Sequence, residues 1–350
     1  MTLARGLNWL AAGLAILSIL AVHALAGDTD PQLDRTVNRG LEWIASHQSR
    51  IGHWTALNGQ YPTAMTGMSG IALLCEGSTP NQGKYAPNIR KAVDYLIARS
   101  RPNGLIGSPS GGDQSYTYGH GFAMLFLSQV LGEEEDLDRR EELIKVLNKA
   151  VAFSGQAQCA SGGWGYVSAK DNNNFDEGST TITQVQGLRG CRNAGIAVPK
   201  EVIDKAVDYI KKGTGGDGGV RYSSSQGMGG GGRPPITAAA VACLFNAGDY
   251  DSNYVPKLLK YCEQHVGVGG SGANDVAGHW HYAHYYYSQV LYREGGKKWD
   301  EYRKTIYKKL IGEAGQDGAW SEGFVGPVYT TAINLTILQL EKGVLPIYQR

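Results

Sequence analysis

Two kinds of apolar pattern alternate along the chain, and both predict helices. The first kind is amphipathic, as in residues 200–212, where Val202, Ala206 and Ile210 form one apolar stripe and Asp204 lies away from it. A Gly-containing turn follows each of these segments and is typical of a helix end. Amphipathic helices are predicted at 33–48, 85–99, 140–153, 200–212, 254–265 and 299–311.

The second kind of segment carries almost no charge and is rich in Ala, Gly, Thr, Ser, Leu and Tyr. A helix without a polar face belongs inside a structure, and small residues let such helices approach closely. These inner helices are predicted at 62–75, 116–131, 179–193, 235–246, 281–292 and 329–341. The alternation predicts an all-α fold over residues 27–350, a closed α/α toroid of six outer–inner helix pairs, with an open α-solenoid as the alternative.

A sequence repeat accompanies the helix pairs. In residues 39–54 a basic residue, Arg39, begins an amphipathic segment that leads to Gln48 and then to Gly52-His53-Trp54. Looser copies keep one half of this layout or the other. The copies begin at Lys91, Lys149 and Lys205, and two later Gln–Trp pairs are Gln158/Trp164 and Gln316/Trp320.

The segment from Arg39 to Trp54 resembles the QW motif of squalene and oxidosqualene cyclases, which share an α/α toroid with the β-subunits of protein prenyltransferases. This resemblance implies that Gln48 and Trp54 join an outer helix to the next turn and have a structural role. We expect the Gln amide to satisfy carbonyls at the end of the helix, while the indole covers the exposed turn.

The first 26 residues read as a secretory signal peptide. Arg5 supplies the positive charge, residues 10–22 form a short apolar core, and Ala24-Leu25-Ala26 is a small-x-small cleavage site. We therefore expect a secreted or periplasmic protein with no stable transmembrane span after cleavage, and an uncleaved anchor is the alternative.

Composition restricts the partners. The formal net charge is +1 and neither sign dominates locally, so a nucleic-acid partner is not expected. The five cysteines match neither a zinc module nor a dense disulfide framework, and no disulfide can be assigned from their spacing.

Acid chemistry has one candidate position. The resemblance implies an Asp-x-Asp-Asp motif that protonates an alkene, and this motif is absent from the sequence. Its nearest counterpart is Phe175-Asp176-Glu177, which leads into the third inner helix, so Asp176 is a candidate catalytic residue. The alternative is that Asp176 or Ser179 caps that helix.

A zinc site is the second chemical possibility, because the resemblance to prenyltransferases implies Asp, Cys and His ligands. His281 and His284 are three residues apart on one helical face, and Asp275 lies upstream. These residues are weak candidates for metal ligands, and the two histidines are also candidate catalytic residues. Without a metal, the same segment predicts a polar, aromatic cavity wall.

The toroid would bring the starts of all six inner helices to one mouth. Hydroxyls, imidazoles and aromatic rings dominate there, which suits a ligand with apolar faces and a few polar groups, such as a terpenoid, or a sugar stacked on rings. The expected ligand-binding residues are Tyr116, Tyr118, His120, Ser179, Thr180, Arg233, Thr237, Tyr285 and Tyr329.

Three functions are consistent with the sequence. The first is a cyclase-like or prenyltransferase-like toroid that binds, and in one version transforms, a hydrophobic ligand. The second is a polysaccharide lyase or hydrolase, which needs two carboxyl groups across a groove. The third is a noncatalytic scaffold that presents a surface to a protein. Carboxyl groups at eligible turns are Asp113, Asp176, Asp275 and Glu322.

Overall fold

The structure is a computed structural model that describes residues 30–171, 174–224, 230–269 and 279–349. Six helices form an outer layer: α2 (Pro31–Ser46), α4 (Ala86–Ala98), α6 (Leu137–Ala157), α8 (Lys200–Gly213), α10 (Val255–His265) and α13 (Gly296–Glu313). Six form an inner layer: α3 (Pro62–Cys75), α5 (Tyr116–Glu133), α7 (Gly178–Asn193), α9 (Pro234–Ala247), α12 (Trp280–Glu294) and α14 (Pro327–Leu338).

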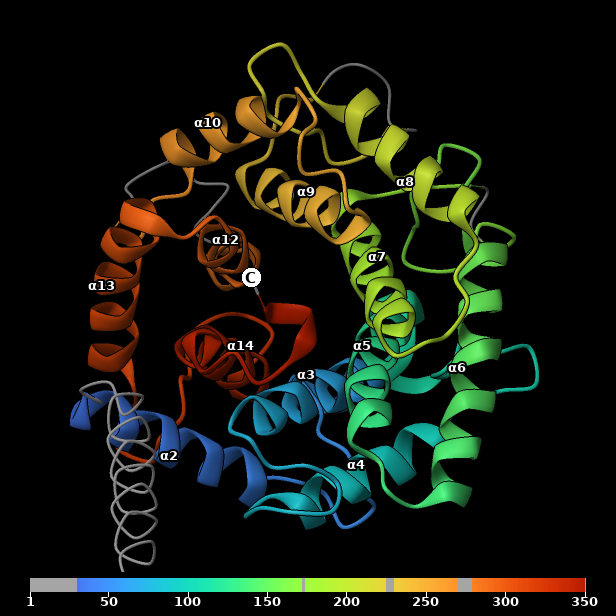
Figure 1. Cartoon of the computed structure of the whole chain (residues 1–350), viewed down its shortest axis with the longest axis vertical. Helices are drawn as coiled ribbons and strands as arrows, with labels where there is room; N and C mark the ends of the chain where they lie inside the picture. Colours follow the sequence, from blue (N-terminus) through green and yellow to red (C-terminus); the bar gives the residue numbers. More distant parts are fainter. Residues whose placement is uncertain (1–29, 172–173, 225–229, 270–278, 350) are drawn as a thin grey trace, which may run out of the picture.

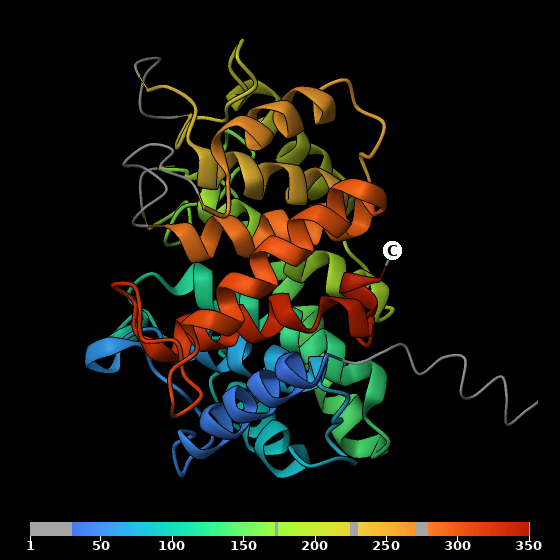
Figure 2. The same ribbon diagram turned by 90° about the vertical axis from the view of Figure 1, so that its left-hand side faces the viewer.

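The two layers form a double-walled ring. In Figure 1 the inner helices surround the centre and the outer helices lie around them. Figure 2 shows that the loops which lead into the inner helices gather at one end of the ring. The predicted all-α, α/α-toroid fold is therefore confirmed. Within the described residues, no helix is long and apolar enough to cross a membrane.

Burial follows the two sequence patterns. In α8 the residues Val202, Ala206 and Ile210 are buried, and the charged positions between them face outward. In α3 all fourteen residues are buried, including Thr63 and Thr66, because this helix packs between neighbouring inner helices and an outer one. The uncharged composition of the inner helices is thus required by their position.

Glycines in the turns let consecutive repeats approach closely. Gly52 has a φ of 96°, and a Cβ there would lie 2.2 Å from the carbonyl oxygen of Lys91 in the next outer helix. Gly318 has the same φ, and a Cβ there would lie 2.5 Å from the carbonyl oxygen of Arg39. The contact from Gly318 to Arg39 joins the last repeat to the first and closes the ring.

The Gln–Trp pairs join helices in a way that differs from our expectation. The Trp54 indole donates to the carbonyl oxygen of Ile44, near the end of α2, over 2.7 Å. The Gln48 amide donates instead to the carbonyls of Gly52 and Asn88, each over 2.9 Å. The indole, which is buried, therefore satisfies the helix end, and the Gln links the turn to the next outer helix.

The third repeat has the same geometry and the last repeat has half of it. The Trp164 indole donates to Ser154 over 2.8 Å, and the Trp320 indole donates to Leu310 over 2.8 Å. Gln158 donates to the turn and to the next outer helix, as Gln48 does. Gln316 is exposed, so the last pair depends on its indole alone.

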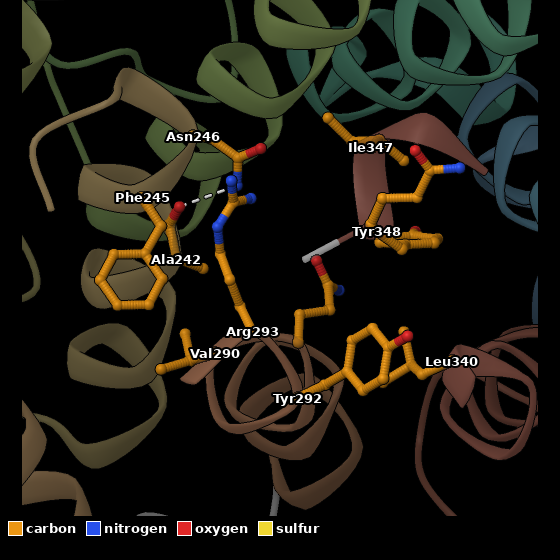
Figure 3. A pocket seen from close by; sticks show the side chains of 11 residues that line it. Ala242, Phe245, Asn246, Val290, Tyr292, Arg293, Leu340, Ile347 and Tyr348 are labelled. Atoms are coloured by element: carbon orange, nitrogen blue, oxygen red, sulfur yellow. Dashed lines mark hydrogen bonds between the residues drawn. The ribbon is translucent and has the colours of Figure 1, made fainter. Parts of the chain in front are cut away.

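The end of the ring opposite the loops is closed by the short helix η4 (Pro346–Tyr348). The Tyr348 hydroxyl lies 2.9 Å from that of Tyr285, and the backbone N–H of Ile347 donates to Gln129 over 3.4 Å. A pocket of about 190 Å³ lies beside Leu345 and Pro346. Another pocket beside this segment has a volume of only about 20 Å³, and Figure 3 shows Ile347 and Tyr348 facing Asn246 and Arg293 across it. That volume is close to the space of one water molecule.

All five cysteines are buried and free, so none forms a disulfide. Burial raises the pKa of the Cys75, Cys191 and Cys243 thiols to about 12 in each case. These residues are therefore apolar packing groups with no thiolate character at neutral pH.

Candidate functional site

The ring encloses a cavity of about 440 Å³ at the end where the inner helices begin. Eight of its fifteen lining residues are aromatic and none is acidic or basic apart from a histidine, so the cavity suits an apolar ligand. The lining residues are Tyr61, Ala64, Met65, Met68, Ser115, Tyr118, Phe122, Tyr166, His279, Tyr282, Tyr285, Phe324, Val325, Tyr329 and Ile333.

Helical periodicity decides which residues line the cavity. On α3 the lining residues include Ala64 and Met68, four positions apart, and on α5 they are Tyr118 and Phe122, again four apart. The four inner helices that line the cavity, α3, α5, α12 and α14, therefore each present one narrow face to it.

A smaller pocket of about 210 Å³ adjoins the cavity. Tyr118, Tyr166, His279 and Tyr282 line both, so the two pockets share part of their wall. The smaller pocket is more polar. Its other lining residues are Ser179, Tyr222, Arg233, Pro235 and Ile236.

A buried carboxylate lies behind the wall of the smaller pocket. Glu177 is the N-cap of α7 and is 0% exposed. It accepts hydrogen bonds from the backbone N–H groups of Ser179 and Thr180 and from the Ser179 hydroxyl. The capping residue of α7 is therefore Glu177, and the expected caps Asp176 and Ser179 were wrong.

Ser179 connects this carboxylate to the cavity. A serine hydroxyl has one hydrogen, which Ser179 donates to Glu177. The Tyr118 hydroxyl, which also contacts the Ser179 hydroxyl, must therefore donate to it. Tyr282 donates to the Ser179 carbonyl over 3.2 Å. The result is a hydrogen-bonded chain from the cavity wall through Ser179 to Glu177.

Burial affects the protonation of both ends of this hydrogen-bonded series, Glu177 and Tyr118. Loss of solvent raises the pKa of Glu177, although the hydrogen bonds from Ser179 and Thr180 act in the opposite direction. Burial also raises the pKa of Tyr118 well above its ordinary value, and the charge of Glu177 adds to this effect. Tyr118 is thus a neutral hydroxyl at every ordinary pH.

Asp176, the expected catalytic acid, lies outside the cavity lining. Its carboxylate accepts hydrogen bonds from Ser161, Tyr209, Ser223 and Ser224, including 2.8 Å from the Ser224 backbone N–H. Burial acts to raise the pKa of Asp176, but these donors outweigh it and the pKa is lowered. Asp176 is therefore an ionised group that ties two turns together, the opposite of a proton donor.

The two histidines expected as metal ligands have different partners. His281 lies 3.3 Å from the Asn334 amide oxygen, and His284 lies 2.8 Å from the Tyr302 hydroxyl. Burial lowers the pKa of both, that of His284 to about 3. Among the described residues, no three His, Cys, Asp or Glu side chains are placed to hold a metal ion. Asp275, the third weak candidate, lies outside the described residues.

Five of the nine expected ligand-binding residues line the two pockets: Tyr118, Ser179, Arg233, Tyr285 and Tyr329. The other four bond within the protein wall: Tyr116 with Asp171, His120 with Ile106 and Ala150, Thr180 with Trp164, and Thr237 with Val220 and Arg233. Tyr116 and His120 lie two positions from Tyr118, on the opposite face of α5, where a wall position is expected.

Four lining tyrosines, Tyr61, Tyr166, Tyr222 and Tyr282, are not among the expected ligand-binding residues, and the repeat contained the signal for two of them. Tyr166 lies two residues after Trp164, and Tyr222 lies two residues after Val220, which is the equivalent position in the next repeat. Their hydroxyls contact each other across the smaller pocket. Aligning the repeats by this turn position would have placed both at the mouth.

The carboxyl groups expected for a carbohydrate-active enzyme do not line the cavity. Asp113 is buried against Thr63 and pairs with Arg99 over 3.0 Å. Glu322 is exposed and, like Asp176, is absent from the lining. Within the described part of the chain, no pair of carboxylates faces the cavity, so the two-carboxylate mechanism has no support there.

Comparison with solved structures agrees with the geometry. The type II terpene cyclase MstE from Scytonema, in complex with geranylgeranyl dihydroxybenzoate, superposes with a TM-score of 0.59 at 13% identity over 90% of this chain and 98% of its own. The unsaturated glucuronyl hydrolase from Bacillus sp. GL1 superposes with a TM-score of 0.61 at 15% identity, over 91% of this chain and 99% of its own. A D-mannose isomerase superposes with a TM-score of 0.60 at 11% identity, over 91% of this chain and 99% of its own.

The fold is an α/α toroid. At these identities the similarity establishes the fold alone, and the three neighbours catalyse different reactions on it. No family model and no curated protein matches the sequence. The function must therefore be argued from the cavity itself.

Proposed function

We propose that this chain binds an isoprenoid or a similarly apolar ligand in the central cavity. The observation that carries the proposal is the lining, in which aromatic rings and the side chains of Met65, Met68 and Ile333 surround the space. A pocket of this kind removes apolar surface from water at both the ligand and the wall. The geranylgeranyl chain bound by MstE is a ligand of this class.

The cavity also offers one route for proton exchange with the ligand. In this proposal a bound ligand gives a proton to Tyr118 as Tyr118 passes its own to Ser179, and Ser179 passes its own to Glu177. The ligand keeps the electron pair of the broken bond, and the carboxylate becomes a carboxylic acid. The hydrogen bonds already run in this direction.

Export by the N-terminal signal belongs to the same proposal. A secreted or periplasmic protein of this kind would take its ligand from outside the cytoplasm. Separation of the cell fractions, with N-terminal sequencing of the mature protein, tests this part and should find a new N-terminus at Gly27.

Binding is tested by incubating the purified protein with geranylgeraniol or squalene and then extracting retained lipid for mass spectrometry. Ala64→Phe places a ring in the cavity and should abolish retention, whereas Met68→Leu, which conserves most of the volume, should not. Absence of retained or converted lipid with the wild type would reject the proposal.

A carbohydrate ligand is distinguished in the same experiment. A mannose or glucuronide oligomer should not be turned over, because the described lining provides no carboxylate pair. Turnover of such a sugar would reverse the assignment.

A further inference from the structure

The smaller pocket contains a cation without an anionic partner. The guanidinium of Arg233 lies over the ring of Tyr222, 4.9 Å from its centroid, and Arg233 lines the pocket. Among the described residues, no carboxylate forms an ion pair with Arg233. The ion pairs there involve other residues: Lys84, Arg99, Arg139, Lys145, Lys200, Lys211, Lys297, Lys298, Arg303 and Lys309.

We propose that this pocket binds the anionic head group of the ligand, a carboxylate, while the apolar tail occupies the central cavity. The inference rests on the proposed function and narrows it, since it makes the ligand an isoprenoid acid or another long apolar carboxylate. The planar guanidinium of Arg233 matches a carboxylate with two parallel hydrogen bonds.

A second donor faces the same pocket. The hydroxyls of Tyr166 and Tyr222 contact each other, and a pair of hydroxyls that shares one hydrogen bond has one further hydrogen to donate. Both tyrosines line the pocket beside Arg233. The pocket therefore offers a cation and a phenolic hydrogen to one anion.

Glu177 does not compete for Arg233. Its carboxylate is fully buried behind the wall and already accepts three hydrogen bonds from Ser179 and Thr180. The backbone of Arg233 is also fixed, because its N–H donates to Val220 over 2.9 Å and its carbonyl accepts from Thr237. The exposed side chain of Arg233 therefore extends from a fixed backbone position at the pocket.

The shape of the combined space supports a single ligand with two ends. Tyr118, Tyr166, His279 and Tyr282 line both pockets, so the two lie directly side by side. The larger pocket is lined almost entirely by apolar and aromatic groups and the smaller one carries the only arginine of the two linings. An apolar chain with one charged end matches this division.

The experiment compares geranylgeranoic acid with geranylgeraniol, which have the same twenty-carbon skeleton and differ at the head. Dissociation constants are measured by quenching of intrinsic fluorescence at one pH and ionic strength. The wild type should bind the acid about tenfold more tightly than the alcohol, the value of one charge-assisted hydrogen bond. Arg233→Gln should remove this preference and leave the affinity for the alcohol unchanged.

Two further variants act as controls. Arg101→Gln removes an exposed charge that does not line either pocket and should keep the preference for the acid. Arg233→Lys keeps the positive charge but lacks the planar guanidinium, so it should keep part of the preference for the acid. Equal binding of acid and alcohol by the wild type, or an unchanged preference in Arg233→Gln, overturns this inference alone. Failure of both ligands to bind overturns the proposed function and the inference together.

Discussion

The hydroxyl of Ser179 lies 2.5 Å from a carboxylate oxygen of Glu177 and donates its only hydrogen to it. This contact does two things. It helps to cap α7, and it orients Ser179 so that its oxygen can accept only from the cavity side, where Tyr118 lies. A helix cap and a cavity wall are therefore built from the same carboxylate.

Replacing Glu177 with Gln should change how stability depends on pH. The folded pKa of Glu177 is raised by burial above 4.5, so the unfolded chain releases this proton first as the pH rises. The contribution of Glu177 to stability is thus complete below pH 4.5 and declines above it. In melting curves from pH 4.5 to 7, Glu177→Gln should gain stability relative to the wild type. A constant difference across this range would show that Glu177 has no raised pKa.

The buried histidines should have the opposite effect. Burial lowers the pKa of His120 to about 4 and that of His284 to about 3, so the unfolded chain takes up protons first as the pH falls below 6.5. The stability that these neutral imidazoles contribute is complete above pH 6.5 and is lost toward pH 4. His284→Gln should make the melting temperature fall less steeply between pH 7 and pH 5 than in the wild type. His47→Gln, at an exposed position, should leave the slope unchanged.

Closure of the ring can be tested at Gly318. A Cβ there would meet the carbonyl oxygen of Arg39 at 2.5 Å, and the φ of 96° adds backbone strain. Gly318→Ala should destabilise the fold by about 2–4 kcal/mol in urea titration. Gly248→Ala is the matched control, because its φ is 91° and nothing lies within 4 Å of the added methyl group. Gly248→Ala should lower the free energy of unfolding by about 1 kcal/mol. Equal losses in both variants would exclude the contact with Arg39 as the cause.

The indole hydrogen bonds should account for most of the effect of the Gln–Trp pairs. Trp164→Phe removes the donor to Ser154 in the last turn of α6 and leaves a small cavity at a fully buried site. The expected loss is about 2–4 kcal/mol by urea unfolding. Trp43→Phe is the comparison at a partly exposed indole that stacks on His47, and it should cost less than about 1 kcal/mol. The prediction fails if the two variants are equally stable.

The sequence predicted the ring because its helices alternate between charged and uncharged surfaces, a signal that does not depend on distant contacts. Every predicted helix overlaps an observed one. Both ends of α3 (Pro62–Cys75) and the C-terminal end of α10, at His265, are the predicted residues. The site was predicted less well. The prediction took every polar or aromatic residue near the start of an inner helix as a ligand-binding residue. Because a helix turns by 100° per residue, Tyr116 and His120 lie on the opposite face from Tyr118 and should not have been grouped with it.

Other parts of the site depend on contacts that no local pattern contains. Asp176 and Glu177 are adjacent, buried acids, and only the folded turns show that hydrogen-bond donors outweigh burial in setting the pKa of the first, while burial outweighs the donors in setting that of the second. The space between Arg233 and Ser179 likewise arises from two different repeats. The residue types in the sequence indicated a cavity with polar groups, but only the folded structure shows which of these groups line the same pocket.

The contact between Gly318 and Arg39 also has a consequence for the order of assembly. During synthesis or translocation each helical hairpin can dock on its predecessor as it emerges, but the flank of the first hairpin has no neighbour until the last one arrives. That apolar flank must stay uncovered for almost the whole passage of the polypeptide, since α2 and α3 both pack on α14. A chaperone would act most usefully during that interval.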